Sequence, residues 1–170
     1  MKFVEQIIAL FGHSSDTKEM SDFLDKHNIH QRPQFAPNEG APEETIGKED
    51  DGYSLRFGGR LSFEENIGPS VGDRDLGYFV LENIRLQGPL NMDKASEFKG
   101  ELPFGLSFSQ TADEIIEILG KPDFAEDPGT RKRVFVWNNV QNLQLGTVLS
   151  PDEKHMRHLE ISPTPKEYRS

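Results

Sequence analysis

Apolar residues in the first thirty positions recur at the spacing of two amphipathic helices. Residues 3–11 place apolar side chains three and four positions apart, and Gly12 then supplies the left-handed residue that commonly ends a helix. A second stripe begins at Met20 and continues at i+3, i+4 and i+7, after a polar segment in which Ser15 or Asp16 is suited to cap the helix. The chain therefore opens with two predicted helices.

The middle of the chain changes from a loop pattern to strand patterns. Residues 32–52 are rich in proline, glycine and acidic residues without periodicity, which predicts a solvated loop. Residues 53–63 alternate around the pair Gly58 and Gly59, and this pattern predicts a β-hairpin with a two-residue turn. After a second acidic loop, the apolar and β-branched character of residues 76–87 predicts a long strand or a pair of strands.

The second half combines a locally specified helix with further strands. Residues 102–108 predict a short apolar strand. Thr111 and Glu114 then form a capping box, apolar residues follow at helical spacing, and Gly120 ends the helix. Three more strands are predicted at residues 133–137, 143–149 and 156–162.

Helical signals followed by runs of strands favour an α+β fold, with an antiparallel sheet packed by a few helices. A chain of 170 residues has the usual size of one domain, so we expect a single domain over residues 1–170. The segments IIALFG at 7–12 and IIEILG at 115–120 match each other. This match raises a second interpretation, in which two related half-units occupy residues 1–100 and 101–170.

Acidic residues outnumber basic residues by 29 to 19, which gives a formal net charge of −10. Such a charge repels nucleic acid and anionic lipid, so we expect neither of them as a partner and favour a basic protein. Solubility alone explains a negative charge equally well. However, the stretch from Glu39 to Asp75 holds ten acidic and four basic residues and so carries −6 of the total, and this concentration favours binding.

The chain has no cysteine, which removes disulfides and thiolate chemistry. Its first residues lack the pattern of a signal peptide, and no apolar run approaches the roughly 18 residues of a membrane span. We therefore expect a cytoplasmic protein.

No residue pattern predicts catalysis, a cofactor or a metal ion. The histidine pairs at 27 and 30 and at 155 and 158 lack a third ligand at zinc spacing. Residues 48–52 lack the alternating aspartates of a calcium loop, and neither a glycine-rich phosphate loop nor a G-x-S-x-G elbow occurs. We expect a protein that is not an enzyme, with no catalytic residues, no cofactor and no metal.

Residues 102–123 combine an LP-x-GL-x-F segment, a helix and an LG-x-P ending, and predicted antiparallel strands follow up to residue 162. This arrangement resembles bacterial immunity proteins of contact-dependent growth inhibition and other polymorphic toxin systems. It is also similar to the helix-and-sheet unit of beta-lactamase inhibitor proteins. The resemblance implies an inhibitor that covers the active site or substrate surface of a cognate toxin domain, expected to be a basic nuclease. Because the shared motif is structural, it carries no site residues over.

The expected binding site lies in the two acidic segments on either side of the predicted hairpin. Charged side chains in exposed loops can steer an oppositely charged partner at little cost to the fold. The candidate toxin-binding residues are Glu43, Glu44, Glu49, Asp50, Asp51, Glu64, Glu65, Asp73 and Asp75. Two other functions stay open, which are a non-catalytic adaptor or secretion chaperone for another basic protein, and a small hydrolase.

Overall fold

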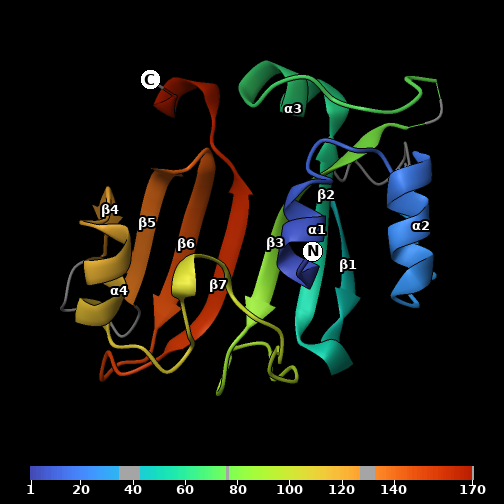
Figure 1. Ribbon diagram of the computed structural model, residues 1–170. Helices are drawn as coiled ribbons and strands as arrows, with labels where there is room; N and C mark the ends of the chain where they lie inside the picture. The colour runs from blue at the N-terminus through green and yellow to red at the C-terminus, as the bar shows by residue number, and fades with distance from the viewer. Residues whose placement is uncertain (35–42, 76, 127–132, 170) are drawn as a thin grey trace.

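Figure 1 shows the computed structural model, which describes residues 1–34, 43–75, 77–126 and 133–169. Its centre is a seven-stranded antiparallel sheet in the order β1-β2-β3-β7-β6-β5-β4, and α1 and α4 lie in front of this sheet in the view shown. The strands are β1 (Glu43–Lys48), β2 (Tyr53–Gly59), β3 (Phe79–Gln87), β4 (Phe124–Ala125), β5 (Arg133–Val140), β6 (Leu143–Leu149) and β7 (Met156–Pro163). The helices are α1 (Phe3–Ile8), α2 (Lys18–Lys26), α3 (Arg60–Asn66) and α4 (Ala112–Leu119), and the 3-10 turns are η1 (Glu49–Asp51), η2 (Pro103–Gly105) and η3 (Lys166–Tyr168). The α+β fold class expected from the sequence is confirmed.

The strands alternate between a core face and an open face. Leu55 of β2 and Leu86 of β3 are fully buried, and they share one hydrophobic cluster with Ile7 of α1 and Ile115 of α4. Helices α1, α2 and α4 and the core therefore lie on the same side of the sheet. The residues between these positions form the opposite side, called the open face below, and its centre consists of Ser54, Arg56, Asn83, Arg85, Gln87, His158 and Glu160.

Both N-terminal helices form where the periodicity predicted them, and one detail differs. Gly12 has a φ of 84°, as expected for a residue that ends a helix. The cap of α2 is Thr17 rather than Ser15 or Asp16, because the Thr17 Oγ1 accepts a hydrogen bond from the Met20 backbone N–H at 3.2 Å. None of the helices in the described ranges is long and apolar enough to cross a membrane.

The predicted helix of the second half is confirmed as α4. The Thr111 Oγ1 accepts a hydrogen bond from the Glu114 backbone N–H at 3.3 Å, and Gly120 follows with a φ of 85°. The Trp137 Nε1–H of β5 donates to the Gly120 carbonyl at 2.8 Å, so the end of the helix is bonded to the sheet. The three strands predicted after it are β5, β6 and β7, and the long strand predicted earlier is β3.

Residues 102–108 do not form the predicted strand. They contain η2, in which Phe104 has a φ of 60° and Gly105 a φ of 73°, and two successive left-handed residues cannot continue an extended chain. Leu102 and Leu106 are nevertheless buried in the core. The sequence pattern identified buried residues correctly and their backbone conformation incorrectly.

The prediction of a loop over residues 32–52 is wrong for residues 43–51, and residues 35–42 lie outside the described ranges. Residues 43–48 form the edge strand β1, which pairs with β2 through partners such as Ile46 and Leu55. Ile46 is only 2% exposed, so this acidic stretch still contributes to the core. The hairpin turn is made by η1 and by Gly52, whose φ is 76°.

The predicted turn at Gly58 and Gly59 is also wrong, because both residues continue β2 and pair with β3. A Cβ atom on Gly58 would lie 2.1 Å from the Glu82 carboxylate, so the absence of a side chain at Gly58 leaves room for Glu82. The chain then enters α3 instead of a strand. Arg60, the first residue of this helix, is 5% exposed and donates from Nε to the Gly77 carbonyl at 2.6 Å.

Each half of the chain supplies three successive antiparallel strands, β1 to β3 and β5 to β7. The last strand of each half lies at the centre, where β3 and β7 pair from Ile84 with Ile161 to Gln87 with His158. From the centre, the strands follow as β3, β2 and β1 towards one edge and as β7, β6 and β5 towards the other. Strand β4 lies beyond β5. The origin of the two half-units by duplication stays a hypothesis.

Candidate binding face

Polar side chains occupy alternate positions of the two central strands on the open face. On β3 these are Asn83, Arg85 and Gln87, with the core residues Ile84 and Leu86 between them. The register of β3 with β7 places Glu160 opposite Arg85 and His158 opposite Gln87. The sheet therefore brings together side chains that are about 75 residues apart in the sequence.

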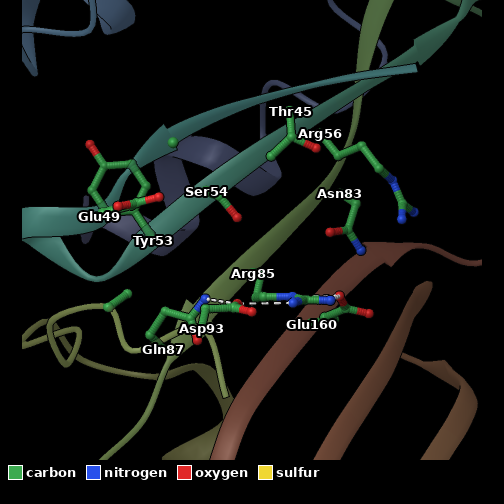
Figure 2. Close-up of a pocket in the computed structure, with 12 residues that line it drawn as sticks. Thr45, Glu49, Tyr53, Ser54, Arg56, Asn83, Arg85, Gln87, Asp93 and Glu160 are labelled. Atoms are coloured by element: carbon green, nitrogen blue, oxygen red, sulfur yellow. Dashed lines mark hydrogen bonds and ion pairs between the residues drawn. The ribbon is translucent and has the colours of Figure 1, made fainter. Parts of the chain in front are cut away.

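Arg85 is the centre of a hydrogen-bonded network that Figure 2 shows. Its Nε–H donates to the Glu160 Oε1 at 2.8 Å, and its Nη1–H donates to the Asp93 Oδ2 at 3.1 Å. The Gln87 Nε2–H donates to the same Asp93 oxygen at 2.7 Å. These bonds connect β3, β7 and the loop after β3 in one arrangement.

Hydrogen bonds of Asn91 hold the loop that carries Asp93. The Asn91 Nδ2–H donates to the carbonyls of Gly88 at 2.9 Å and Ala95 at 2.8 Å. The Asn91 Oδ1 accepts from the Ala95 backbone N–H at 2.9 Å. Because Asn91 is 9% exposed, these bonds are shielded from water, and the loop presents Asp93 in a defined position.

A pocket of about 610 Å³ opens on this face, between the network and the hairpin of β1 and β2. This volume is in the range of roughly 300–1,000 Å³ that is usual for ligand clefts. Besides Arg85, Asp93 and Glu160, its lining includes Thr45, Glu49, Ser54, Arg56, Asn83 and Gln87. On a neighbouring part of the face, the Arg56 Nε–H donates to the Glu82 carboxylate at 3.1 Å.

The surroundings on this face shift the pKa values of Asp93, Arg85 and His158. The hydrogen bond from Gln87 lowers the pKa of Asp93, and the nearby Arg85 guanidinium lowers it further. Burial opposes the charge on Arg85, but the bonded carboxylates of Glu160 and Asp93 raise its pKa overall. Burial, together with the charge of Arg85, lowers the pKa of His158 and favours the neutral imidazole.

The first predicted acidic segment extends from the start of the edge strand β1 to the border of this pocket. Glu43 and Glu44 begin the edge strand β1, and the Glu44 carboxylate accepts a hydrogen bond from the Gln34 backbone N–H at 2.6 Å. Glu49, Asp50 and Asp51 form η1 and are all exposed. Glu49 is the member of the predicted set that lines the pocket.

The second predicted acidic segment lies at the other end of β2. Glu64 and Glu65 belong to α3, and Asp73 and Asp75 follow in the loop before β3. The seven residues of β2 span roughly 20 Å, so η1 lies far from this second segment, whereas Glu43 and Glu44 pair with Gly58 and Phe57 next to α3. A hydrogen bond from Ser70 and an ion pair with Arg74 lower the pKa of Glu64, so this carboxylate already has partners.

The histidines of the two predicted pairs lie in different surroundings. The ring of His27 packs against Phe3 with a centroid distance of 4.9 Å, and His158 lies on the open face. Within the described ranges, no group of three or more histidine, aspartate or glutamate side chains is placed to hold a metal ion.

The sequence reasoning missed Asn83, Arg85, Gln87, Asp93 and Glu160. One signal was available, because residues 83, 85 and 87 are polar at every second position and the residues between them, Ile84 and Leu86, are apolar. The same alternation occurs at residues 158, 160 and 162. Neither pattern predicts that these two strands pair with each other.

The fold and the face define an α+β protein with helices on one side of an antiparallel sheet and a polar pocket on the other. No known protein family and no curated protein sequence matches this chain. Among solved structures, the chain is similar to a DUF4309 family protein (YjgB) from Bacillus subtilis subsp. subtilis strain 168. The two share 12% sequence identity with a TM-score of 0.41, over 84% of this chain and 76% of that chain.

Proposed function

We propose that this protein is a non-catalytic inhibitor that binds a basic protein through η1 and the adjacent open face. The expected partner is the toxin domain of a bacterial toxin–immunity pair, with a basic nuclease as the most suitable class. One observation carries the proposal: Glu49 and Asp50 are exposed and have no ion pair within the described ranges, and Glu49 lines the polar pocket. Their charge is available to a partner.

The chemistry of the pocket supports binding rather than proton transfer. A carboxylic acid that donates a proton near neutral pH needs a raised pKa, whereas the pKa of Asp93 is lowered. Both carboxylates of the network accept hydrogen bonds from Arg85, which holds them in place as acceptors. Such groups suit the recognition of donors on another molecule.

The first acidic segment is the better candidate contact of the two. Glu64 is already bound by Ser70 and Arg74, and the Lys166 Nζ donates to the carbonyls of Glu64 and Glu65 at 2.6 and 3.0 Å. These bonds use the second segment to hold α3 to the C-terminal residues. Association in the cytoplasm should be fast and sensitive to salt, because free surface charges act over only about 10 Å at 0.1 M salt.

The test uses the toxin domain encoded beside this protein, and it compares two charge reversals of equal size. Glu49→Lys with Asp50→Lys changes the proposed contact, and Glu117→Lys with Glu167→Lys changes two exposed residues elsewhere. We expect the first variant to slow association with the toxin at least about tenfold at low salt and to protect cells less. The second variant should bind as the unchanged protein does.

The melting temperature of both variants should stay within a few degrees of the unchanged protein, because all four side chains are exposed. Full protection by the first variant would show that η1 is not the contact. Failure of the unchanged protein to form a complex with the toxin domain, or to protect cells from it, would refute the proposed function.

A further inference from the structure

Two amide side chains of β3 are almost completely buried at the pocket, and Gln87 has a buried oxygen without a hydrogen-bond donor. Asn83 is 5% exposed and Gln87 is 4% exposed. Among the described residues, neither the Asn83 side chain nor the Gln87 Oε1 has a hydrogen-bond partner. Figure 2 shows the Asn83 amide pointing into the pocket. A buried polar group without a partner costs about 1–3 kcal/mol, so the unmatched Gln87 Oε1 indicates a role beyond stability.

The orientation of the Gln87 amide follows from its neighbour. Its Nε2–H donates to the ionised Asp93 carboxylate at 2.7 Å, and a carboxylate can only accept. The Gln87 Oε1 is therefore directed away from Asp93 as an acceptor. This assignment makes the unmatched group an acceptor and not a donor.

The carboxylates of the network add further acceptors. Asp93 uses Oδ2 for both Arg85 and Gln87, and Glu160 uses Oε1 for both of its bonds to Arg85. In the described part of the chain, the second oxygen of each carboxylate has no hydrogen-bond donor. The three acidic residues of the lining, Glu49, Asp93 and Glu160, also exceed its two arginines in charge. The pocket thus has unmatched acceptors and a net negative charge.

We propose that this pocket binds the guanidinium group of an arginine side chain that the partner inserts into it, an inference that rests on the proposed function. A guanidinium has five N–H donors in a planar fork, which can bond to several carboxylate and amide oxygens at once. An ammonium group has three donors at a single point and would match fewer of these acceptors. An anion fits poorly, because Arg85 is already bound by two carboxylates and Arg56 by Glu82.

The first experiment measures binding without the toxin. The protein is titrated with the tripeptide acetyl-Gly-Arg-Gly-amide and, separately, with its citrulline counterpart, which has nearly the same shape and no charge. Amide resonances of the Asn83 and Gln87 side chains report the binding in NMR spectra. Charge-assisted hydrogen bonds contribute about 1.5–3 kcal/mol each, so we expect the citrulline peptide to bind at least about tenfold more weakly.

Variants connect this binding to the pocket. Gln87→Leu and Glu160→Gln should each weaken the arginine peptide at least about tenfold, and Glu160→Gln keeps the shape of the side chain in case Gln87→Leu does not fold. The control is Gln144→Leu, the same change on β6 outside the pocket, which should leave the affinity unchanged. Equal affinity for the two peptides, or an unchanged affinity of Glu160→Gln, would overturn the inference.

The outcomes separate this inference from the proposed function. If the toxin complex forms and both pocket variants bind the toxin normally, the inference is wrong and the proposed function stands. If no toxin complex forms but the arginine peptide binds through Glu160, the pocket is assigned correctly and the proposed function is wrong. Tighter binding of free arginine than of the peptide would show a small-molecule site and overturn the assignment to a partner side chain.

Discussion

Replacing Ile115 by alanine tests whether the packing of α4 stabilises the whole fold. Ile115 is fully buried, and its side chain belongs to the same hydrophobic cluster as the core residues of the sheet. Substitution of a buried isoleucine by alanine costs about 2–5 kcal/mol, because apolar contacts are lost and a cavity remains. For a loss of about 3 kcal/mol in a chain of this size, the melting temperature should fall by about 6–12 °C.

Ile118 supplies a matched control on the same helix. It is 42% exposed, so Ile118→Ala removes little buried surface, and alanine has the higher helix propensity. We expect its stability to change by no more than about 0.5 kcal/mol.

Unfolding of both variants can be followed by fluorescence of Trp137, the only tryptophan of the chain, which is 3% exposed and bonded to the end of α4. Circular dichroism provides a second probe. Equal losses in the two variants would refute the assignment of the buried face of α4.

The remaining predictions concern glycine conformation and pH. Gly52→Ala should destabilise the protein more than Gly120→Ala in urea unfolding, because the new Cβ would lie 2.3 Å from the Phe98 nitrogen, whereas no heavy atom lies within 4 Å at Gly120. The backbone conformation alone, with a φ of 85° and a ψ of −177°, should cost Gly120→Ala about 1–3 kcal/mol. Burial raises the pKa of Tyr53 to about 12, so its contribution to stability is complete below the unfolded pKa of about 10 and is lost as the pH rises through 12. Ultraviolet titration of the unchanged protein minus Tyr53→Phe should show a transition near pH 12, and one near pH 10 would contradict this. The pKa of Asp93 is lowered, so its contribution is complete above about pH 4 and is lost as the pH falls through the folded value; Asp93→Asn should flatten the acid side of the stability profile, and an unchanged profile would count against the network.

The parts of the fold that the sequence predicted correctly are those determined by neighbouring residues. Thr111 and Gly120 specify both ends of α4 within ten positions, and the structure has both features. The strands of the second half are joined by short turns, so their pairing also follows from local order. Local signals are reliable there because no distant segment competes with them.

The errors occur where distant contacts decide the conformation. Ile46 lies in an acidic stretch without a clear strand pattern, and β1 forms because it can pair with β2 and bury this side chain. Gly58 looks like a turn residue, but β3 pairs with it, and Glu82 occupies the space beside it. Arg60 then enters α3 because the Gly77 carbonyl, 17 residues later, accepts its Nε–H.

The candidate site also has residues that local sequence predicts and residues that only distant contacts bring together. Counting charges along the chain was sufficient to predict Glu49 and its neighbours, because a cluster of acidic residues can be recognised without knowing how the strands pair. The contact of Arg85 with Glu160 depends on the register of β3 and β7, which joins residues 75 positions apart. Alternating polarity could indicate that both strands have a polar face, but not that the two faces meet.

The open face is not uniform from one edge of the sheet to the other, and this difference bears on how a partner could bind. On β5 the core side chains are Phe135 and Trp137, so the alternate residues Val134 and Val136 belong to the open face, where Val148 of β6 pairs with Val134. These valines are apolar, whereas the corresponding positions of β2 and β3 are polar and charged. Stable protein interfaces combine an apolar, well-packed centre with oriented polar contacts. A partner that covered the whole face would bury the half-buried Val134 and Val136 while its arginine entered the pocket, so hydrophobic contact could supply affinity and the charged network could select the partner.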